Sequence, residues 1–395
     1  MLKSKLLIVA GITLAVTICC CGCNSYAKKK QSMVGKWQND SANANIPVAT
    51  GMLENGDIDQ AIEKLQECIA GSPDLFEAHL LLGKAYFMQN RLVKANTSFA
   101  KALELDGQSA QGWYWLGETA LRQGRYKAAI DCYDYAMQID PSASAYVIAA
   151  AQAHADMDSY DTAIALLLEK KKAFVGDVAV VIAHADVLTR SGKKEEAIKV
   201  YQNGLLFNSD STQLQKGLGY LYMVEKRWED AAKIFEKLLA GAQDRKNEEY
   251  LRILSTCSMN TGEYNRSLGY LDRIDPEKKK DADFWLRTGQ AALGAGRAKR
   301  AIACAQKALF LNAGWNDATM LLGCGQYMDG EYRNAIETFS RVVYNKKVSS
   351  FAWMMTGKCY QQIGDDKKAK KALEKVDTSV ANERMLGFVT DAMEK

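Results

Sequence analysis

The chain has 395 residues, which is too long for one ordinary hydrophobic core, so it should form either several domains or one elongated array. Only 4 prolines and no evident flexible linker beyond the N-terminal region favour the array. Six lysines and one aspartate precede Ser41, a net +5 against +4 for the whole chain, so the body is close to −1. A nearly neutral body lacks the basic surface that nucleic-acid binding requires, and the sequence excludes that class of partner.

The first 22 residues have the pattern of a targeting segment. Lys3 and Lys5 precede an uncharged apolar run from residue 6 to 21, which ends at Gly22 and Cys23. This ending resembles a bacterial lipoprotein signal, although Cys20 stands where that family usually has leucine. The resemblance implies removal of residues 1–22 and lipidation of Cys23. The alternative is an uncleaved membrane anchor, and both interpretations place the body outside the cytoplasmic membrane.

Residues 23–41 are small, polar and rich in lysine, which is the composition of a flexible tether. The segment joins the proposed anchor to the body of the chain. Acyl chains on Cys23 would hold that body at a membrane surface without a spanning helix.

A helical hairpin from Trp113 to Pro141 is the template for the rest of the chain. Its apolar residues recur at helical spacing on both sides of Gly124, and neither helix can bury its apolar side alone. Aligned copies follow every 34 residues, with one interval of 36. The copies start at Ala42, Phe76, Ala110, Ser144, Val178, Thr212, Glu248, Ala282, Asn316 and Ser350.

Three positions of each copy carry small or turn-forming residues. A small residue in the first helix and another in the second predict close helix crossing. The first-helix set is Ala49, Gly83, Gly117, Ala151, Ala185, Gly219, Ser255, Gly289, Gly323 and Gly357. The second-helix set is Ala61, Ala95, Ala129, Ala163, Ala197, Ala231, Ser267, Ala301, Ala335 and Ala369. The turn between the helices has glycine in seven copies and Asn90, Asp158 or Lys226 in the others, so we expect positive φ there and a strained or looser turn at Lys226.

The period and the Trp113, Gly117, Ala129, Tyr133 and Pro141 pattern resemble the tetratricopeptide repeat. The resemblance implies an all-α fold: a right-handed α-solenoid of about ten hairpins over residues 42–383. Pro47 predicts that the first helix begins late, capped by Asn45. Residues 384–395 should form a C-terminal capping helix, because Met385, Leu386, Val389 and Met393 share one side of it.

Motifs for catalysis are absent from the sequence. No metalloprotease, serine-hydrolase, phosphate-loop or dinucleotide motif is present, and the three histidines fall on packing positions of first helices. We therefore expect no enzyme activity, no cofactor and no metal site. The six cysteines of the repeats are scattered one to a repeat, so we expect small apolar fillers rather than disulfides.

Function must then come from the surface, and the family resemblance implies a concave groove lined by first helices. Exposed positions there could bind a protein or peptide, and methionine would let an apolar patch adapt to its partner. The candidate partner-binding residues are Lys84, Phe87, Tyr114, Glu118, Arg122, Met320, Tyr327, Met328, Phe351 and Met354. The five from Met320 to Met354 should form an exposed apolar patch, unless neighbouring helices cover it.

The sequence thus predicts a non-enzymatic interaction scaffold or assembly factor, tethered as a lipoprotein to a bacterial envelope membrane and facing the periplasm or exterior. The alternative is recognition of envelope polysaccharide or another non-protein ligand by the same groove, for which Tyr114 and Tyr220 would serve.

Overall fold

The computed structural model describes residues 30, 33, 36, 37, 39–170, 172–241, 247–274, 281–346 and 348–376. The predicted signal segment, the lipidation site Cys23 and the predicted capping helix 384–395 lie outside these residues. Every regular element within the described ranges is a helix. Among them, none combines the length and the apolar composition that crossing a membrane requires.

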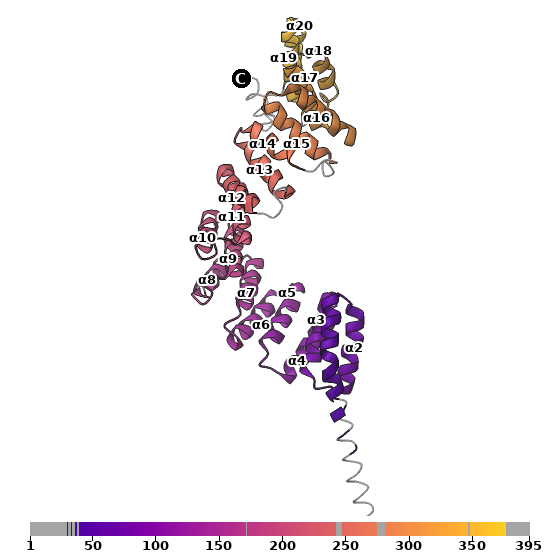
Figure 1. Cartoon of the computed structure of the whole chain (residues 1–395), viewed down its shortest axis with the longest axis vertical. Helices are drawn as coiled ribbons and strands as arrows, with labels where there is room; N and C mark the ends of the chain where they lie inside the picture. Colours follow the sequence, from indigo (N-terminus) through magenta and orange to yellow (C-terminus); the bar gives the residue numbers. More distant parts are fainter. Residues whose placement is uncertain are drawn as a thin grey trace, which may run out of the picture. The chain divides into compact units, whose positions relative to one another are not determined.

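Helices alternate along the chain as the first and second members of hairpins (Figure 1). The first helices after residues 39–55 are α3 (Phe76–Met88), α5 (Ala110–Arg122), α7 (Ser144–Asp156), α9 (Val178–Arg190), α11 (Thr212–Val224), α13 (Glu248–Asn260), α15 (Ala282–Gly294), α17 (Asn316–Met328) and α19 (Ser349–Gln362). The second helices are α2 (Ile58–Gly71), α4 (Leu92–Leu105), α6 (Tyr126–Ile139), α8 (Tyr160–Lys170), α10 (Lys194–Phe207), α12 (Trp228–Gly241), α14 (Tyr264–Asp272), α16 (Ala298–Leu311), α18 (Tyr332–Ser340) and α20 (Asp366–Leu373). Eight of the ten aligned copies start at the first residue of a first helix, and the tenth starts one residue inside α19.

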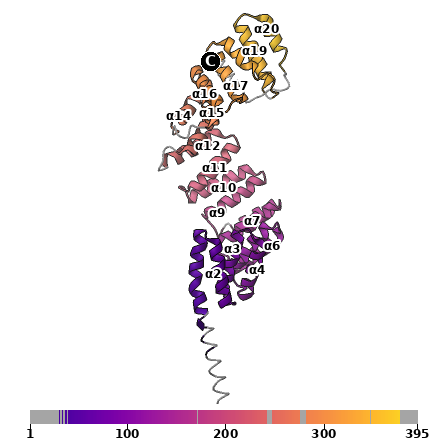
Figure 2. The same cartoon turned by 90° about the vertical axis from the view of Figure 1, so that its right-hand side faces the viewer.

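The chain divides into two compact units, Met1–Val200 and Tyr201–Lys395. In the first unit, α2, α3 and α4 lie side by side, and α3 also contacts α5 (Figure 2). In the second unit, α15, α16 and α17 pack in the same order. Each unit is therefore a stack of hairpins in which first helices also touch first helices, which is the architecture of an α-solenoid.

The turns between the two helices of each hairpin have the predicted backbone. All seven turn glycines have positive φ, from 73° at Gly124 to 85° at Gly56. Asn90, Asp158 and Lys226 adopt the same conformation, with φ of 57–58°. The turn at Lys226 is not looser, because the Lys226 amide donates to the Met223 carbonyl (3.1 Å) as the Gly124 amide donates to the Leu121 carbonyl (2.9 Å). The strain there is confined to the lysine backbone.

The small positions confirm the predicted close crossing. A Cβ atom added to Gly117 would lie 2.6 Å from the Tyr133 ring, and one added to Gly83 would lie 2.5 Å from the Phe99 ring. The alanines at the second-helix position are fully or almost fully buried. In one hairpin both small positions are serine, and the buried Ser255 and Ser267 hydroxyls lie 2.7 Å apart in a hydrogen bond.

The predicted start of the first helix is wrong. Residues 39–55 are continuously helical, so neither Asn45 nor Pro47 begins the helix. Pro47 lies inside it, where its ring removes one backbone donor. Ala42 and Ala49 are buried against the first hairpins, and this packing outweighs the local preference for a late start.

Candidate functional site

Aromatic rings from α3, α4 and α5 gather around Trp115. Phe87 and Phe99 are buried, and Tyr114 and Trp115 are half-buried. The Trp115 ring lies edge-on to Phe87, with centroids 5.3 Å apart, and stacks over Phe99 at 6.4 Å. Tyr114 meets Trp115 edge-on at 5.5 Å. We call Lys84, Phe87, Phe99, Tyr114 and Trp115 the Trp115 cluster. Such offset and edge contacts are the preferred geometries of aromatic pairs, so the rings form a stable platform.

Lys84 is the charged member of this cluster. Its ammonium lies 5.4 Å from the centre of the Trp115 ring, and its side chain is half-buried. Burial lowers the pKa of Lys84, because removing the ammonium from water disfavours its charged form. No carboxylate pairs with it among the described residues. A cation held in this way is available to an acidic or carbonyl oxygen of a bound partner.

Tyr114 extends the platform toward α7. Its ring packs against Tyr146 and Tyr133, with centroid distances of 5.5 and 5.9 Å. Burial, with the nearby Glu118 carboxylate as a second cause, raises the pKa of Tyr114 to about 12. The phenol is therefore neutral at physiological pH and can both donate and accept a hydrogen bond.

Two predicted binding residues have structural partners instead. The Tyr133 hydroxyl donates to the Glu118 carboxylate (2.8 Å). Arg122 places its guanidinium 3.7 Å from the centre of the Phe87 ring and donates to the Phe87 carbonyl (3.2 Å). Arg122 thus satisfies a carbonyl near the end of the preceding first helix, a favourable place for a cation.

The same arginine contact occurs once more in the first unit. Arg190 donates to the Ala155 carbonyl (3.0 Å), again 35 residues back, and pairs with Asp156 at 2.9 Å. Two equivalent arginines therefore link successive first helices, and the variation of this position between copies did not reveal that role.

The predicted exposed apolar patch of the second unit is wrong for two of its five members. Met320 and Phe351 are only 0% and 6% exposed. Tyr327, Met328 and Met354 are half-buried and pack against the same hydrophobic core. The physical cause is contact between first helices, because α17 touches both α15 and α19 and covers side chains that point along the stack. Phe87 is buried in the first unit for the same reason.

The cysteines and two of the histidines are buried packing residues. All six cysteines of the repeats are free and buried, in agreement with the expected apolar role. Burial raises the pKa of Cys132 and of Cys257 to about 11, so their thiols stay protonated at neutral pH. His79 donates to the Pro73 carbonyl (2.8 Å), and His184 is also buried.

Sequence reasoning identified Lys84, Phe87 and Tyr114 but missed Trp115, the centre of the cluster. Trp115 lies between Tyr114 and Leu116, at a position where most other copies have a smaller residue. Trp115 is the one aromatic residue at this position of the ten copies, and this was the available signal.

The fold and this surface define a class: an α-solenoid that presents rings and a cation on its first helices. Tetratricopeptide repeat models match residues 52–118, 110–143, 142–310, 286–350 and 351–379. Together they cover residues 52–379 without a gap. This part of the chain consists of tetratricopeptide repeats.

Similar proteins are distant in sequence. The chain is 24% identical to the mouse Superkiller complex protein 3 over 355 residues, 87% of this chain and 20% of that protein. It is 22% identical to the Escherichia coli K12 Lipopolysaccharide assembly protein B over 246 residues, 59% of this chain and 62% of that protein. A crystal structure of a tetratricopeptide repeat protein from Parabacteroides merdae is 15% identical, with a TM-score of 0.43 over 72% of this chain and 98% of that one. The chain thus spans less than two thirds of each of these two curated relatives.

Proposed function

We propose that this protein is a non-enzymatic scaffold that holds a protein or peptide partner on the first-helix surface of its first unit. The observation that carries the proposal is the Trp115 cluster, where a half-buried ammonium without a carboxylate lies beside an aromatic platform. Aromatic anchors and a desolvated cation are the side chains that dominate binding energy in protein interfaces. Tetratricopeptide repeats support a protein partner in general terms, and its identity is open.

The absence of catalysis is part of the proposal. Within the described ranges, no three acidic, histidine or cysteine side chains are grouped so that they could hold a metal ion. The relative in Escherichia coli is named an assembly protein, and an assembly role suits a chain that offers surfaces rather than reactive groups.

Membrane tethering through Cys23 is a second part of the proposal. It is supported by the apolar run and by the Gly22-Cys23 pair in the sequence. The test is incorporation of radiolabelled fatty acid into the full chain in bacterial cells. We expect labelling and membrane association of the native protein, and loss of both in Cys23→Ser. Labelling that survives this substitution would exclude Cys23 as the acceptor.

Partner binding is tested by site-directed photo-crosslinking in the same cells. Met88 is half exposed at the end of α3, one turn beyond Lys84, and a photo-reactive residue there should give discrete protein adducts. A reactive residue at Val93, which is 77% exposed on the second helix α4, is the matched control and should give none.

Loss of the Met88 adducts in Lys84→Met, with an unchanged melting temperature, would tie capture to the Trp115 cluster. Equal adducts from Met88 and Val93, or adducts indifferent to Lys84→Met, would contradict the proposal. Binding of polysaccharide on a glycan array, lost on Tyr114→Ala, would support the non-protein ligand instead.

A further inference from the structure

The second unit contains a cavity between one first helix and two second helices. It measures about 260 Å³ and is bounded by α14, α15 and α16. Its lining residues are Asp272, Phe284, Trp285, Thr288, Arg300, Ala303, Cys304 and Lys307. This space would hold roughly nine water molecules, enough for a small organic group.

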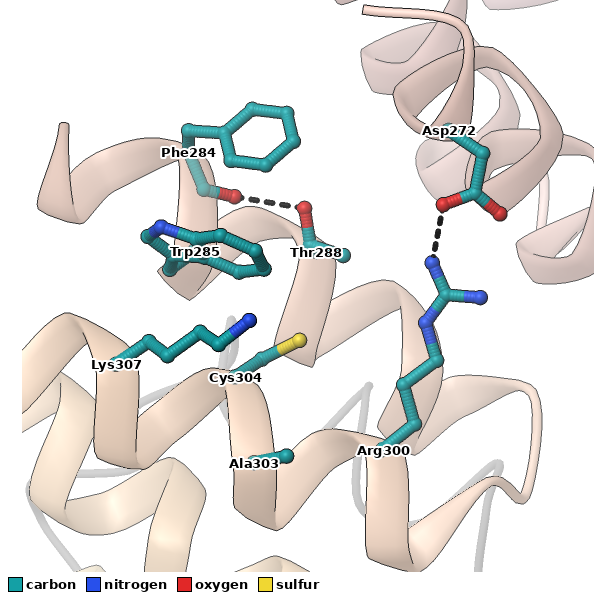
Figure 3. Close-up of a pocket in the computed structure, with 8 residues that line it drawn as sticks. All are labelled: Asp272, Phe284, Trp285, Thr288, Arg300, Ala303, Cys304 and Lys307. Atoms are coloured by element: carbon teal, nitrogen blue, oxygen red, sulfur yellow. Dashed lines mark hydrogen bonds and ion pairs between the residues drawn. The ribbon is translucent and has the colours of Figure 1, made fainter. Parts of the chain in front are cut away.

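Two cations border this cavity from α16 (Figure 3). The Lys307 ammonium lies 4.0 Å from the centre of the Trp285 ring. Arg300 forms an ion pair with Asp272 of the preceding hairpin. The Cys304 thiol lies between these two cations. Burial raises its pKa, and the positive charges of Arg300 and Lys307 lower it by a smaller amount. The cavity therefore has an aromatic wall on one side and a guanidinium on the other.

The charges of the lining do not balance. Asp272 is the only acidic residue that lines the cavity, and it pairs with Arg300. Lys307 has no acidic partner among the residues that the structure describes. Burial raises the pKa of the Cys304 thiol, which stays neutral at physiological pH. The lining thus has a net charge of +1.

The contact between Trp285 and Lys307 is by itself a packing feature of the repeats. The same two positions, 22 residues apart, hold Trp113 stacked on Tyr135 and Trp353 under Lys375. What distinguishes the hairpin of Trp285 is its surroundings. In the hairpin of Trp353, residues equivalent to Phe284, Cys304 and Asp272 are Ala352, Ala372 and Ser340, so the aromatic wall and the arginine-aspartate pair are not reproduced.

We infer that this cavity binds a carboxylate carried on an apolar body, with the carboxylate near Lys307 and Arg300 and the apolar part against Trp285. Phe284 is buried behind Trp285, and the two rings meet edge-on at 5.3 Å. Lys307 is exposed, so a ligand can reach its ammonium. A single negative charge would neutralise the +1 charge of the lining, whereas a phosphate dianion would leave a net charge of −1. The face of Trp285 already has a cation over it, and the remaining apolar wall favours a hydrocarbon or an aromatic ring. Thr288 donates its hydroxyl to the Phe284 carbonyl (2.8 Å), so this hydroxyl already has an acceptor within α15.

This carboxylate could belong to a small organic acid or to a peptide. Isothermal titration of the full chain with 3-phenylpropionate, and with a tripeptide that ends in phenylalanine with a free carboxylate, separates the two sources. We expect binding of at least one probe and no binding of the matching amides. Tighter binding of the tripeptide would indicate a peptide ligand, and tighter binding of the acid would indicate a metabolite.

The variant Lys307→Met removes the ammonium and keeps an unbranched side chain on Trp285. It should weaken binding about tenfold or more, because methionine cannot form the charge-assisted hydrogen bond that the ammonium would donate to the carboxylate of the probe. Lys307→Arg should retain binding. Lys375→Met, the matched change beside Trp353, should leave the affinity unchanged. Binding of the amides, equal binding of inorganic phosphate, or indifference to Lys307→Met would each overturn the inference.

Discussion

Lys226 is the only residue other than glycine, asparagine or aspartate in the turn position of a hairpin, and its φ is 58°. A side chain with Cβ crowds the backbone in this left-handed region, and lysine has no short polar group to offset the cost. The turn nevertheless keeps its hydrogen bonds, since the Arg227 amide donates to the Tyr222 carbonyl (2.8 Å). The neighbouring helices therefore impose this backbone on the lysine.

Replacing Lys226 by glycine should stabilise the second unit. Relief of the left-handed strain outweighs the greater freedom of glycine in the unfolded chain, and we expect a gain of about 0.5–1 kcal/mol. The measurement is the urea midpoint of unfolding. Asn90→Gly is the control and should change stability less, because asparagine tolerates the same φ of 58°. Equal gains at both positions would show that lysine adds no particular strain.

Local sequence predicted the turns and the small positions because both depend on one hairpin at a time. The turn between the two helices of a hairpin needs a residue with positive φ. Their crossing needs a small residue, as where Gly117 packs against the Tyr133 ring. Exposure of the first-helix side chains depends instead on the next hairpin. Met320 and Phe351 are buried by neighbouring first helices, and the partner of Arg122 lies 35 residues earlier. The candidate site was therefore predicted only in part.

At the scale of the helix pair, the crossing of α13 and α14 is unusual. Serine replaces the glycine or alanine of other hairpins on both helices, and the two buried hydroxyls bond to each other. A hydroxyl pair keeps the crossing close, since serine adds little volume. It also makes each serine depend on the other, because a buried hydroxyl without a partner is costly.

This dependence predicts a double-mutant cycle. Ser255→Ala or Ser267→Ala alone should lower the free energy of unfolding by about 1–2 kcal/mol, because the remaining hydroxyl loses its partner. The double substitution should be nearly neutral, as the other hairpins already pair small apolar residues there. Chemical denaturation of the four proteins gives the coupling. Additive losses would mean that each hydroxyl finds a second partner.

At the scale of the whole chain, extensive contacts join described helices that are next or next but one in sequence, such as α3 with α4 and α5. Stability in such an array is a sum of hairpin terms and of terms between neighbours. Damage to one hairpin should then loosen its neighbours and leave distant hairpins protected.

Phe99 and Phe339 allow a reciprocal test of this locality. They occupy the same position of their hairpins, both are fully buried, and both rings pack against a glycine of the preceding helix. Truncation of either to alanine should cost about 3–5 kcal/mol locally through the cavity it leaves. Hydrogen exchange followed by mass spectrometry should show faster exchange in α17 to α19 for Phe339→Ala and in α3 to α5 for Phe99→Ala. If either substitution accelerates exchange equally in both units, the chain unfolds as one cooperative body and the nearest-neighbour description is wrong.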